Sequence, residues 1–248
     1  MMKITKKILS LMLAVIMAVP VILAMPSTAS AATVNSSVDE HLVAQYFTDS
    51  NLTADKSGNG FNLETVGSGM NWTSNDGVDC VKFPGGSNTN YFRVRTNEML
   101  SGADMTHGLT ITLRAKMSGS GWQRFFELSE GGGYGNGSTT SYVYLSPNES
   151  GTVRFKNTSY NNDESGKMSP GMDSSWHSYA VVIYNGFATI HKDGRYWARL
   201  DDSNRIKDTW LKRIKNGYLL LGASSYKDDT AFAQMIPLPT TSSGHRRA

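Results

Sequence analysis

Disulfide chemistry is almost excluded by composition, because the 248 residues include a single cysteine, Cys80. One thiol cannot form an internal disulfide. The fold must therefore be stabilised by the burial of apolar side chains, for which a chain of this length is sufficient. Cys80 shares a face with Val78 in a short alternating stretch, so we expect it to be a small buried side chain rather than a nucleophile.

Net charge is also small once the first seven residues are set aside. Lys3, Lys6 and Lys7 lie there, and without them the count of Lys and Arg falls from 24 to 21, which equals the 21 Asp and Glu. A neutral chain has no overall positive field that would attract phosphates or an anionic membrane surface. We therefore expect no nucleic-acid partner.

Long apolar runs are lacking outside the N-terminus. Residues 8–25 form such a run behind the three lysines, and the small residues Ala29-Ser30-Ala31 follow it. This order is typical of a secretory signal peptide. We predict residues 1–31 as a signal peptide cleaved after Ala31, residues 32–39 as a polar leader, and a secreted protein without membrane contact after cleavage. The alternative is a single membrane anchor, because the run approaches the minimum length of a span.

Alternation of apolar and polar residues is the dominant pattern in the rest of the chain, as in residues 109–117. Side chains alternate between the two faces of a strand. Turn dipeptides such as Asn185-Gly186 and Asp193-Gly194 separate these stretches and favour type I′ hairpin turns. The pattern predicts a three-strand meander over residues 177–200 within an all-β antiparallel sandwich.

Five short motifs occur along the chain in a fixed order. They are the apolar stretch at 42–47, the Asp-Lys-Ser-Gly-Asn-Gly loop at 55–60, the Phe-Pro-Gly-Gly turn at 83–86, the Trp-His strand at 176–182 and the Leu-Leu-Leu-Gly strand at 219–222. In order and spacing they resemble the laminin G-like, or concanavalin A-like lectin and glucanase, jelly rolls of bacterial secreted proteins. The resemblance covers about residues 40–233, and we assign the jelly-roll domain to residues 40–236. It implies a two-sheet antiparallel jelly-roll sandwich of a kind that usually binds carbohydrate and is often attached to a glycoside hydrolase.

The closing strand of the resembled family is not recognisable in this chain. That strand is close to Phe-x-Gly-x-Ile-Asp-Asp-x-Arg-Ile-Tyr and runs beside the first strand. Phe232 fits its start, but the acidic pair and the Arg-Ile-Tyr are absent, and the segment from Pro237 is polar. We predict that the closing strand is missing, as in a truncated or frameshifted reading frame. Residues 237–248 are then an unstructured tail, and the strand at 42–47 is left without its partner.

The catalytic carboxylates of the glucanase branch are missing as well. That branch carries Glu-x-Asp-x-x-Glu on one strand, which places the first two carboxylates on one face. The nearest segment, Glu127-Leu-Ser-Glu130, has no Asp and directs its two glutamates to opposite faces. We therefore predict no catalytic residue in this chain and interpret Glu127 as a carboxylate at a strand edge.

Aromatic residues are the candidates for sugar recognition, since sugar C–H groups stack on rings while polar side chains bond the hydroxyls. Tyr142 and Tyr144 are two residues apart on one expected strand face, Trp122 precedes them, and Tyr134 lies in the Gly-rich loop at residues 131–137. We predict these four as carbohydrate-binding residues. Each of them could instead pack in the core, which is where the resemblance places Trp176.

A structural calcium ion is the most plausible cofactor. Asp49, Asp55 and Asn59 supply hard oxygen ligands in one loop, and the resemblance implies that some members hold Ca²⁺. The alternative is that these side chains bond their own backbone in Asx turns.

These observations together predict a secreted, non-catalytic carbohydrate-binding module that recognises a polysaccharide. Two alternatives stay open. One is the truncated N-terminal part of a larger secreted glycoside hydrolase, with a glycosidase domain in a longer homologue. The other is an adhesion or protein-binding module.

Overall fold

Most of the ordered elements are strands that arise from the alternating stretches of the sequence. The computed structural model describes residues 41–85, 89–116, 121–131, 140–226, 228–229, 232 and 235–237, which lie in one compact unit, His41–Thr241. The predicted signal peptide, the polar leader and residues 238–248 lie outside the described residues. No helix in the described part is long and apolar enough to cross a membrane.

Thirteen strands alternate with a few short helical segments along the described chain. They are β1 (Glu64–Val66), β2 (Asn71–Asn75), β3 (Val78–Lys82), β4 (Tyr91–Arg95), α3 (Thr96–Met99), β5 (Leu109–Ala115), β6 (Phe126–Glu130), β7 (Tyr142–Ser146), the 3₁₀ turn η2 (Asn148–Ser150), β8 (Thr152–Lys156), β9 (His177–Tyr184), β10 (Phe187–Lys192), β11 (Arg195–Asp201), α4 (Asp208–Ile214), β12 (Gly217–Leu221) and β13 (Met235–Pro237).

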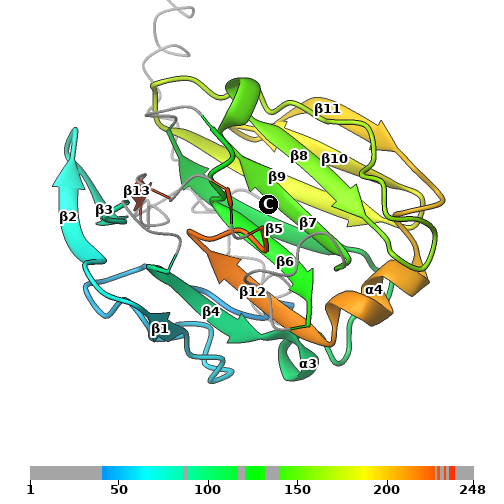
Figure 1. Cartoon of the computed structure of the whole chain (residues 1–248). Helices are drawn as coiled ribbons and strands as arrows, with labels where there is room; N and C mark the ends of the chain where they lie inside the picture. The colour runs from blue at the N-terminus through cyan, green and yellow to red at the C-terminus, as the bar shows by residue number, and fades with distance from the viewer. Residues whose placement is uncertain are drawn as a thin grey trace, which may run out of the picture. The chain divides into compact units, whose positions relative to one another are not determined.

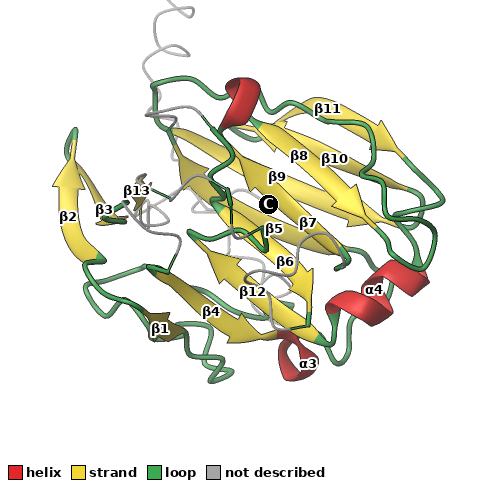
Figure 2. Ribbon diagram, in the orientation of Figure 1, coloured by secondary structure: helices red, strands yellow, loops and turns green. Residues whose placement is uncertain are grey.

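The strands form three sheets, and every pairing is antiparallel (Figures 1 and 2). The six-stranded sheet has the order β1-β4-β12-β6-β7-β8, the four-stranded sheet β11-β10-β9-β5, and the three-stranded sheet β13-β3-β2. The predicted antiparallel jelly-roll class is therefore confirmed. The prediction counted two sheets, and the third exists because the β2–β3 hairpin pairs with β13 instead of with a strand of either larger sheet.

The predicted meander is formed by β9, β10 and β11. Asp193 and Gly194 have φ values of 51° and 76°, as a type I′ turn requires at both positions. At the other turn only Gly186 has a positive φ, 92°. The pairing was therefore predicted correctly, whereas the turn type was predicted correctly at one of the two turns.

The main core receives side chains from both larger sheets. Val143 of β7 and Phe155 of β8 meet Val181 of β9 and Ile190 of β10, and all four are fully buried. Because side chains alternate along β7, Tyr142 and Tyr144 point to the other face of the six-stranded sheet. Cys80 of β3 is buried, as predicted.

Helix α4 lies at the end of β6 and β12 (Figure 2). Its buried Trp210 packs against Phe155, with ring centroids 5.4 Å apart. The Trp210 indole N–H donates to the backbone oxygen of Tyr142 over 3.2 Å. The helix thereby fixes β7 from the core side of the sheet.

The expected strand at residues 42–47 does not form. Phe47 has a φ of 59°, which no extended strand adopts. The backbone of residues 42–47 bonds to side chains of a neighbouring loop instead. The Gln45 N–H donates to Asp55 over 3.0 Å, and the Asn59 amide donates to the backbone oxygens of Leu42 and Val43. Side chains of that loop take the place that a paired strand would occupy.

Strand β13 ends at Pro237, which is opposite Cys80 on β3. It is an edge strand of its sheet, and proline is tolerated at an edge because its missing N–H faces no partner. Residue 237, expected to begin the unstructured tail, thus belongs to a short strand. The missing closing strand itself remains a prediction.

Candidate functional site

The outer face of the six-stranded sheet carries a dense group of polar and aromatic side chains. Glu127 on β6 is opposite Tyr144 on β7, which is opposite Arg154 on β8. Opposite residues of neighbouring strands share a face. The next row runs from Ser129 through Tyr142 to Lys156 in the same way. We use the name polar cluster for the interacting side chains on and around this face: Trp122, Arg124, Glu127, Tyr142, Tyr144, Arg154, Glu164, Tyr226 and Asp229.

Arg124 lies at the centre of the polar cluster. Its guanidinium carbon is 3.7 Å from the centroid of the Tyr144 ring and 5.6 Å from that of Trp122. The guanidinium of Arg154 approaches Trp122 from 5.7 Å. Such cation–π contacts are strengthened where water is excluded. Trp122, Tyr142 and Tyr144, three of the four predicted sugar-binding residues, are therefore brought together, whereas Tyr134 lies outside the described residues.

Glu164 connects the tyrosines to the arginines. Its carboxylate accepts a hydrogen bond of 2.5 Å from the Tyr142 hydroxyl and one of 2.5 Å from Arg154. The Tyr144 hydroxyl reaches the same carboxylate at 3.4 Å, and Tyr226 lies 3.0 Å from the Tyr142 hydroxyl. These contacts hold both tyrosine rings in fixed positions.

Tyr142 and Tyr144 do not form an exposed platform, because both side chains are 0% exposed. Burial and the neighbouring Glu164 carboxylate raise the pKa of Tyr142, so its hydroxyl remains a proton donor. The part of the prediction that expected the two rings to stack on a sugar is wrong. They form the floor of the polar cluster. Its solvent-reaching part, which we call the rim, consists of the partly exposed side chains of Trp122, Arg154, Glu164 and Tyr226.

Glu127 is not a carboxylate at a strand edge, as was predicted, but is 0% exposed on an interior strand. It accepts a hydrogen bond from Arg124 over 3.3 Å and one from the Ser225 N–H over 3.1 Å. Burial raises the pKa of Glu127 to about 7, and Arg124 offsets this effect only in part. No substrate can reach this carboxylate while the segment that contains Ser225 lies over it.

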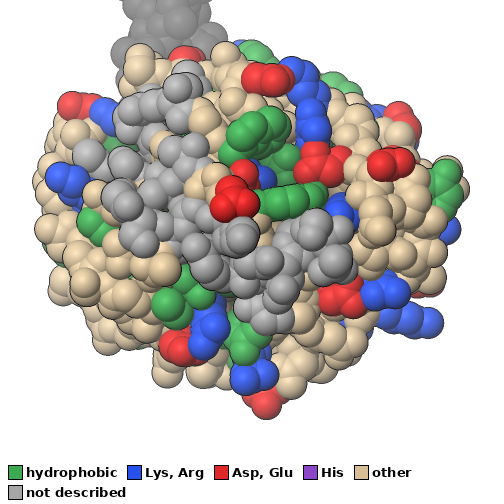
Figure 3. All heavy atoms as spheres, viewed as in Figure 1, with side chains coloured by type: hydrophobic (Ala, Val, Ile, Leu, Met, Phe, Trp, Pro, Cys, Tyr) green, Lys and Arg blue, Asp and Glu red, His purple; other side chains and the backbone are tan. Residues whose placement is uncertain are grey.

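Asp229 completes the group from the segment that follows β12. It pairs with Arg124 at 2.9 Å and accepts a hydrogen bond of 2.5 Å from the Ser224 hydroxyl. Burial raises the pKa of Asp229, while Arg124 acts in the opposite direction. Hydrophobic, acidic and basic side chains are intermixed on the face that Figure 3 shows, in keeping with such mixed pairing.

Five members of the polar cluster were not predicted from the sequence: Arg124, Arg154, Glu164, Tyr226 and Asp229. Arg154 could have been found, because alternation places it on the same face as Tyr144 once the β7–β8 hairpin is recognised. Glu164 is in an isolated bridge with Lys156 rather than in a strand, so no periodic pattern marks it. Tyr226 comes 84 residues after Tyr142, and nothing in the local sequence relates the two.

Of the three predicted calcium ligands, Asp49 and Asp55 use their carboxylate oxygens for contacts within the protein, and the Asn59 amide nitrogen donates to the backbone of Leu42 and Val43. The Asp55 carboxylate accepts four hydrogen bonds, from the backbone of Gln45, Ser57 and Phe61 and from the Ser57 hydroxyl. Asp49 pairs with Lys56 at 2.7 Å. The residues therefore do not fit a calcium ion as they are arranged, and within the described part no three His, Cys, Asp or Glu side chains lie close enough to hold a metal. The Asx-turn alternative accounts for these contacts.

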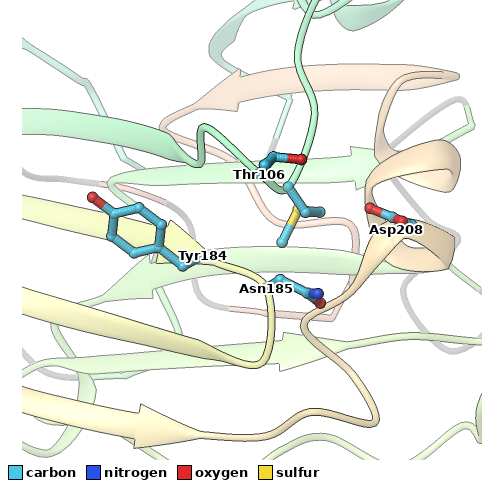
Figure 4. Close-up of a pocket in the computed structure, with 5 residues that line it drawn as sticks. Thr106, Tyr184, Asn185 and Asp208 are labelled. Carbon is cyan, nitrogen blue, oxygen red and sulfur yellow. The ribbon is translucent and has the colours of Figure 1, made fainter.

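Other aromatic residues are distributed over the rest of the described surface. Trp176, expected in the core, is half-buried, and the Nζ of Lys116 lies 5.3 Å from its ring. Trp197 and Tyr160 are exposed. Figure 4 shows an open hollow between Tyr184 at the end of β9, Asn185, Thr106, and Asp208 at the start of α4.

Comparison with known proteins supports the fold. No protein-family model matches the chain, and no match was found among curated protein sequences. Among solved structures, domain 4 of the GH43 extracellular arabinanase AbnA from Geobacillus stearothermophilus, in complex with arabinotriose, has 12% identity and a TM-score of 0.54; the match covers 79% of this chain and 89% of that one. The binding domain of botulinum neurotoxin DC, in complex with SialylT, has 10% identity and a TM-score of 0.54 over 81% of this chain and 47% of that one. The chain therefore shares the jelly-roll fold of these two domains.

Proposed function

We propose that this protein is a carbohydrate-binding module that recognises a polysaccharide through the rim of the polar cluster. The observation that carries the proposal is the partly exposed Trp122 ring, which two arginine side chains hold beside a partly exposed carboxylate, Glu164. The arabinanase domain with the same fold, in complex with arabinotriose, supports this class of ligand.

The rim combines the two kinds of contact that sugar binding requires. The indole of Trp122 offers an apolar face to sugar C–H groups, while Arg154 and Glu164 offer a donor and an acceptor for hydroxyls. The floor tyrosines hold Glu164 in place through direct hydrogen bonds. Because these contacts exist without ligand, little side-chain freedom remains to be lost on binding.

The test is native affinity electrophoresis in gels that contain arabinan, xylan, a mixed-linkage glucan or mucin. Trp122→Ala should weaken retention by the best polysaccharide at least tenfold, since stacking of a base on an aromatic ring contributes about 1–3 kcal/mol and a sugar should be comparable. Glu164→Gln should weaken it less. Tyr160→Ala is the matched control, because Tyr160 is an exposed ring outside the polar cluster. Equal retention of Trp122→Ala and wild type, with unchanged melting temperatures, would disprove the proposed site.

Secretion is part of the proposal, and its support is the signal-like N-terminus. Cleavage after Ala31 would give a mature chain that begins at Ala32, which N-terminal sequencing of the protein from the culture medium would measure. The hydrolase alternative receives no support from Glu127, because this carboxylate is buried. The adhesion alternative predicts binding to a protein and to none of the polysaccharides in the gels.

A further inference from the structure

A β-bulge redirects one tryptophan at the edge of the four-stranded sheet. Ile190 of β10 is opposite Ala198 of β11, but the next residue, His191, is opposite Tyr196. Trp197 is therefore the extra residue of the bulge. Bulges commonly re-aim a side chain at a functional position, and the Trp197 side chain is 51% exposed.

The Trp197 ring is held against a segment that joins the edges of the two larger sheets. This segment, residues 165–173, bonds to β8 through Met168 and Val153 and then meets Trp197 at Gly171. A Cβ atom on Gly171 would lie only 2.8 Å from Cζ2 of the ring, and Gly171 has a φ of 61°. Glycine is thus required at this position for both space and conformation.

A buried lysine backs the same ring. The Nζ of Lys192 lies 5.0 Å from the centroid of Trp197 and donates to the Gly171 backbone oxygen over 2.8 Å. Lys192 is 9% exposed. The ring is therefore held by Gly171 and Lys192, while Trp197 remains 51% exposed.

Polar groups gather around Lys192, which lies against the ring. Asp173, which is 53% exposed, lies 3.5 Å from Lys192 and 3.2 Å from Nε2 of His177. The other ring nitrogen of His177 contacts Asp193 at 2.6 Å. The Ser175 N–H, His177 and Lys192 together lower the pKa of Asp173 to about 2, so this acceptor is ionised at any physiological pH.

One buried hydroxyl at this end of the sheet lacks a partner. Tyr179 is opposite Lys192 across β9 and β10 and is 2% exposed, yet its hydroxyl has no hydrogen-bond partner among the described residues. An unpaired buried hydroxyl is costly and calls for a specific explanation. A buried water molecule beside Asp173 and Lys192 would supply a partner.

We propose that Trp197, Asp173 and Lys192 form a second sugar-binding subsite, specific for an uncharged sugar unit and separate from the rim of the polar cluster. A fixed, half-exposed indole beside a carboxylate and an ammonium group suits sugar C–H groups and hydroxyls. Asp173 and Lys192 carry charges of opposite sign, so this pair favours neither an anionic nor a cationic ligand. The subsite deepens the proposed function and rests on it. Two subsites on one module would raise its avidity for a long polysaccharide.

The experiment is calorimetric titration with a neutral trisaccharide taken from the polysaccharide that most retards the wild-type chain. Wild type should bind two equivalents. Trp197→Ala should bind one, and so should Trp122→Ala. The matched control is Tyr196→Ala, which removes the neighbouring exposed ring and should leave two equivalents. If Trp197→Ala is less stable, Asp173→Asn tests the same subsite with the ring in place and should weaken the second binding event at least threefold.

The outcomes separate this inference from the proposed function. Two equivalents in Trp197→Ala and unchanged affinities in Asp173→Asn would overturn the second subsite, even if Trp122→Ala abolishes binding at the rim. One equivalent in wild type that only Trp197→Ala removes would establish the Trp197 subsite and refute the rim. No binding by wild type to any neutral sugar in the gels, with a bound protein instead, would overturn both.

Discussion

At the scale of single residues, Glu127 shows how the polar cluster balances burial against pairing. A fully buried carboxylate is costly unless it is paired and hydrogen-bonded. Arg124 and the Ser225 N–H provide those partners, but Arg124 also serves Asp229. Because one guanidinium is shared by two carboxylates, it offsets the buried negative charge of Glu127 only in part. Burial remains the larger effect and raises the pKa of Glu127 to about 7.

This predicts a pH dependence of stability that Glu127→Gln should remove. The pKa of Glu127 is higher in the folded than in the unfolded chain, so folding favours the protonated form. Its contribution is complete below about pH 4.5 and is lost as the pH rises through about 7. Relative to Glu127→Gln, wild type should lose about 3 kcal/mol of unfolding free energy between pH 4.5 and 8.

Urea unfolding at several pH values measures this difference. Glu64→Gln is a suitable control, because exposed Glu64 pairs with Arg93 on the same sheet and that contact lowers its pKa. Its effect should be small and of the opposite sign. A difference between wild type and Glu127→Gln that stays constant with pH would show that folding does not raise the pKa of Glu127.

Alternation made part of this site predictable at the residue scale, and long-range cover made the rest unpredictable. Tyr142 and Tyr144 are two residues apart, so the sequence alone predicts that they share a strand face. Their burial depends on Glu164 and on Tyr226, which follows Tyr142 by 84 residues. No local pattern specifies which distant segment covers a strand face. The two buried tyrosine rings were therefore predicted to be exposed.

At the scale of elements, glycine is required at some strand ends and turns for one of two reasons: a positive φ or the close approach of a neighbouring strand. Gly194 has a φ of 76° with nothing within 4 Å of a Cβ position, so only its conformation requires glycine. Gly217 at the start of β12 has no positive φ, yet a Cβ there would lie 1.7 Å from the backbone oxygen of Ser129. Close approach of β12 to β6 is what requires glycine at this position.

Three alanine substitutions should therefore differ in a graded way. Gly217→Ala should cost about 3 kcal/mol or more, because β12 must move away from β6. Gly194→Ala should cost about 1 kcal/mol through strain in φ. Gly102→Ala, with no positive φ and open space around it, should cost nothing measurable. Chemical unfolding gives all three values, and an equal loss for Gly217→Ala and Gly194→Ala would contradict the close-approach argument.

The same contrast explains which elements the sequence could predict. Asn216-Gly217 looks like Asp193-Gly194, and both dipeptides favour a hairpin turn. Only Asp193-Gly194 forms a hairpin turn. Gly217 already belongs to β12, the strand between β4 and β6. Hairpins between neighbouring stretches were predictable, since the turn and both strands are local. Residues 42–47 were not, because an extended pattern does not show whether any strand will pair with it.

At the scale of the whole molecule, the fold places its two candidate sugar contacts on different sheets. The polar cluster lies on the outer face of the six-stranded sheet, and Trp197 lies on the edge strand of the four-stranded sheet. The main core lies between those sheets. Both sites therefore depend on one hydrophobic core, and a substitution in it should weaken both together. Single substitutions on the surface can separate them.

Stability of the whole molecule should be independent of calcium. Partial burial raises the pKa of Asp55, but hydrogen bonds from Gln45, Ser57 and Phe61 outweigh it and lower the pKa overall. The carboxylate is thus ionised and its oxygens are used by N–H and O–H donors, which tie residues 42–47 to the loop that follows them. A calcium ion would have to displace those donors.

The melting temperature should consequently be the same with added calcium and with a chelator. Asp55→Asn should lower stability by about 1–3 kcal/mol under both conditions, because an amide nitrogen would face an N–H donor. Asp49→Asn is the control, since its pair with Lys56 is exposed and should contribute little to stability. Because the folded pKa of Asp55 is depressed, its contribution is present above about pH 4 and is lost as the pH falls. A melting temperature that calcium raises and a chelator restores, in wild type but not in Asp55→Asn, would instead establish Asp55 as a calcium ligand.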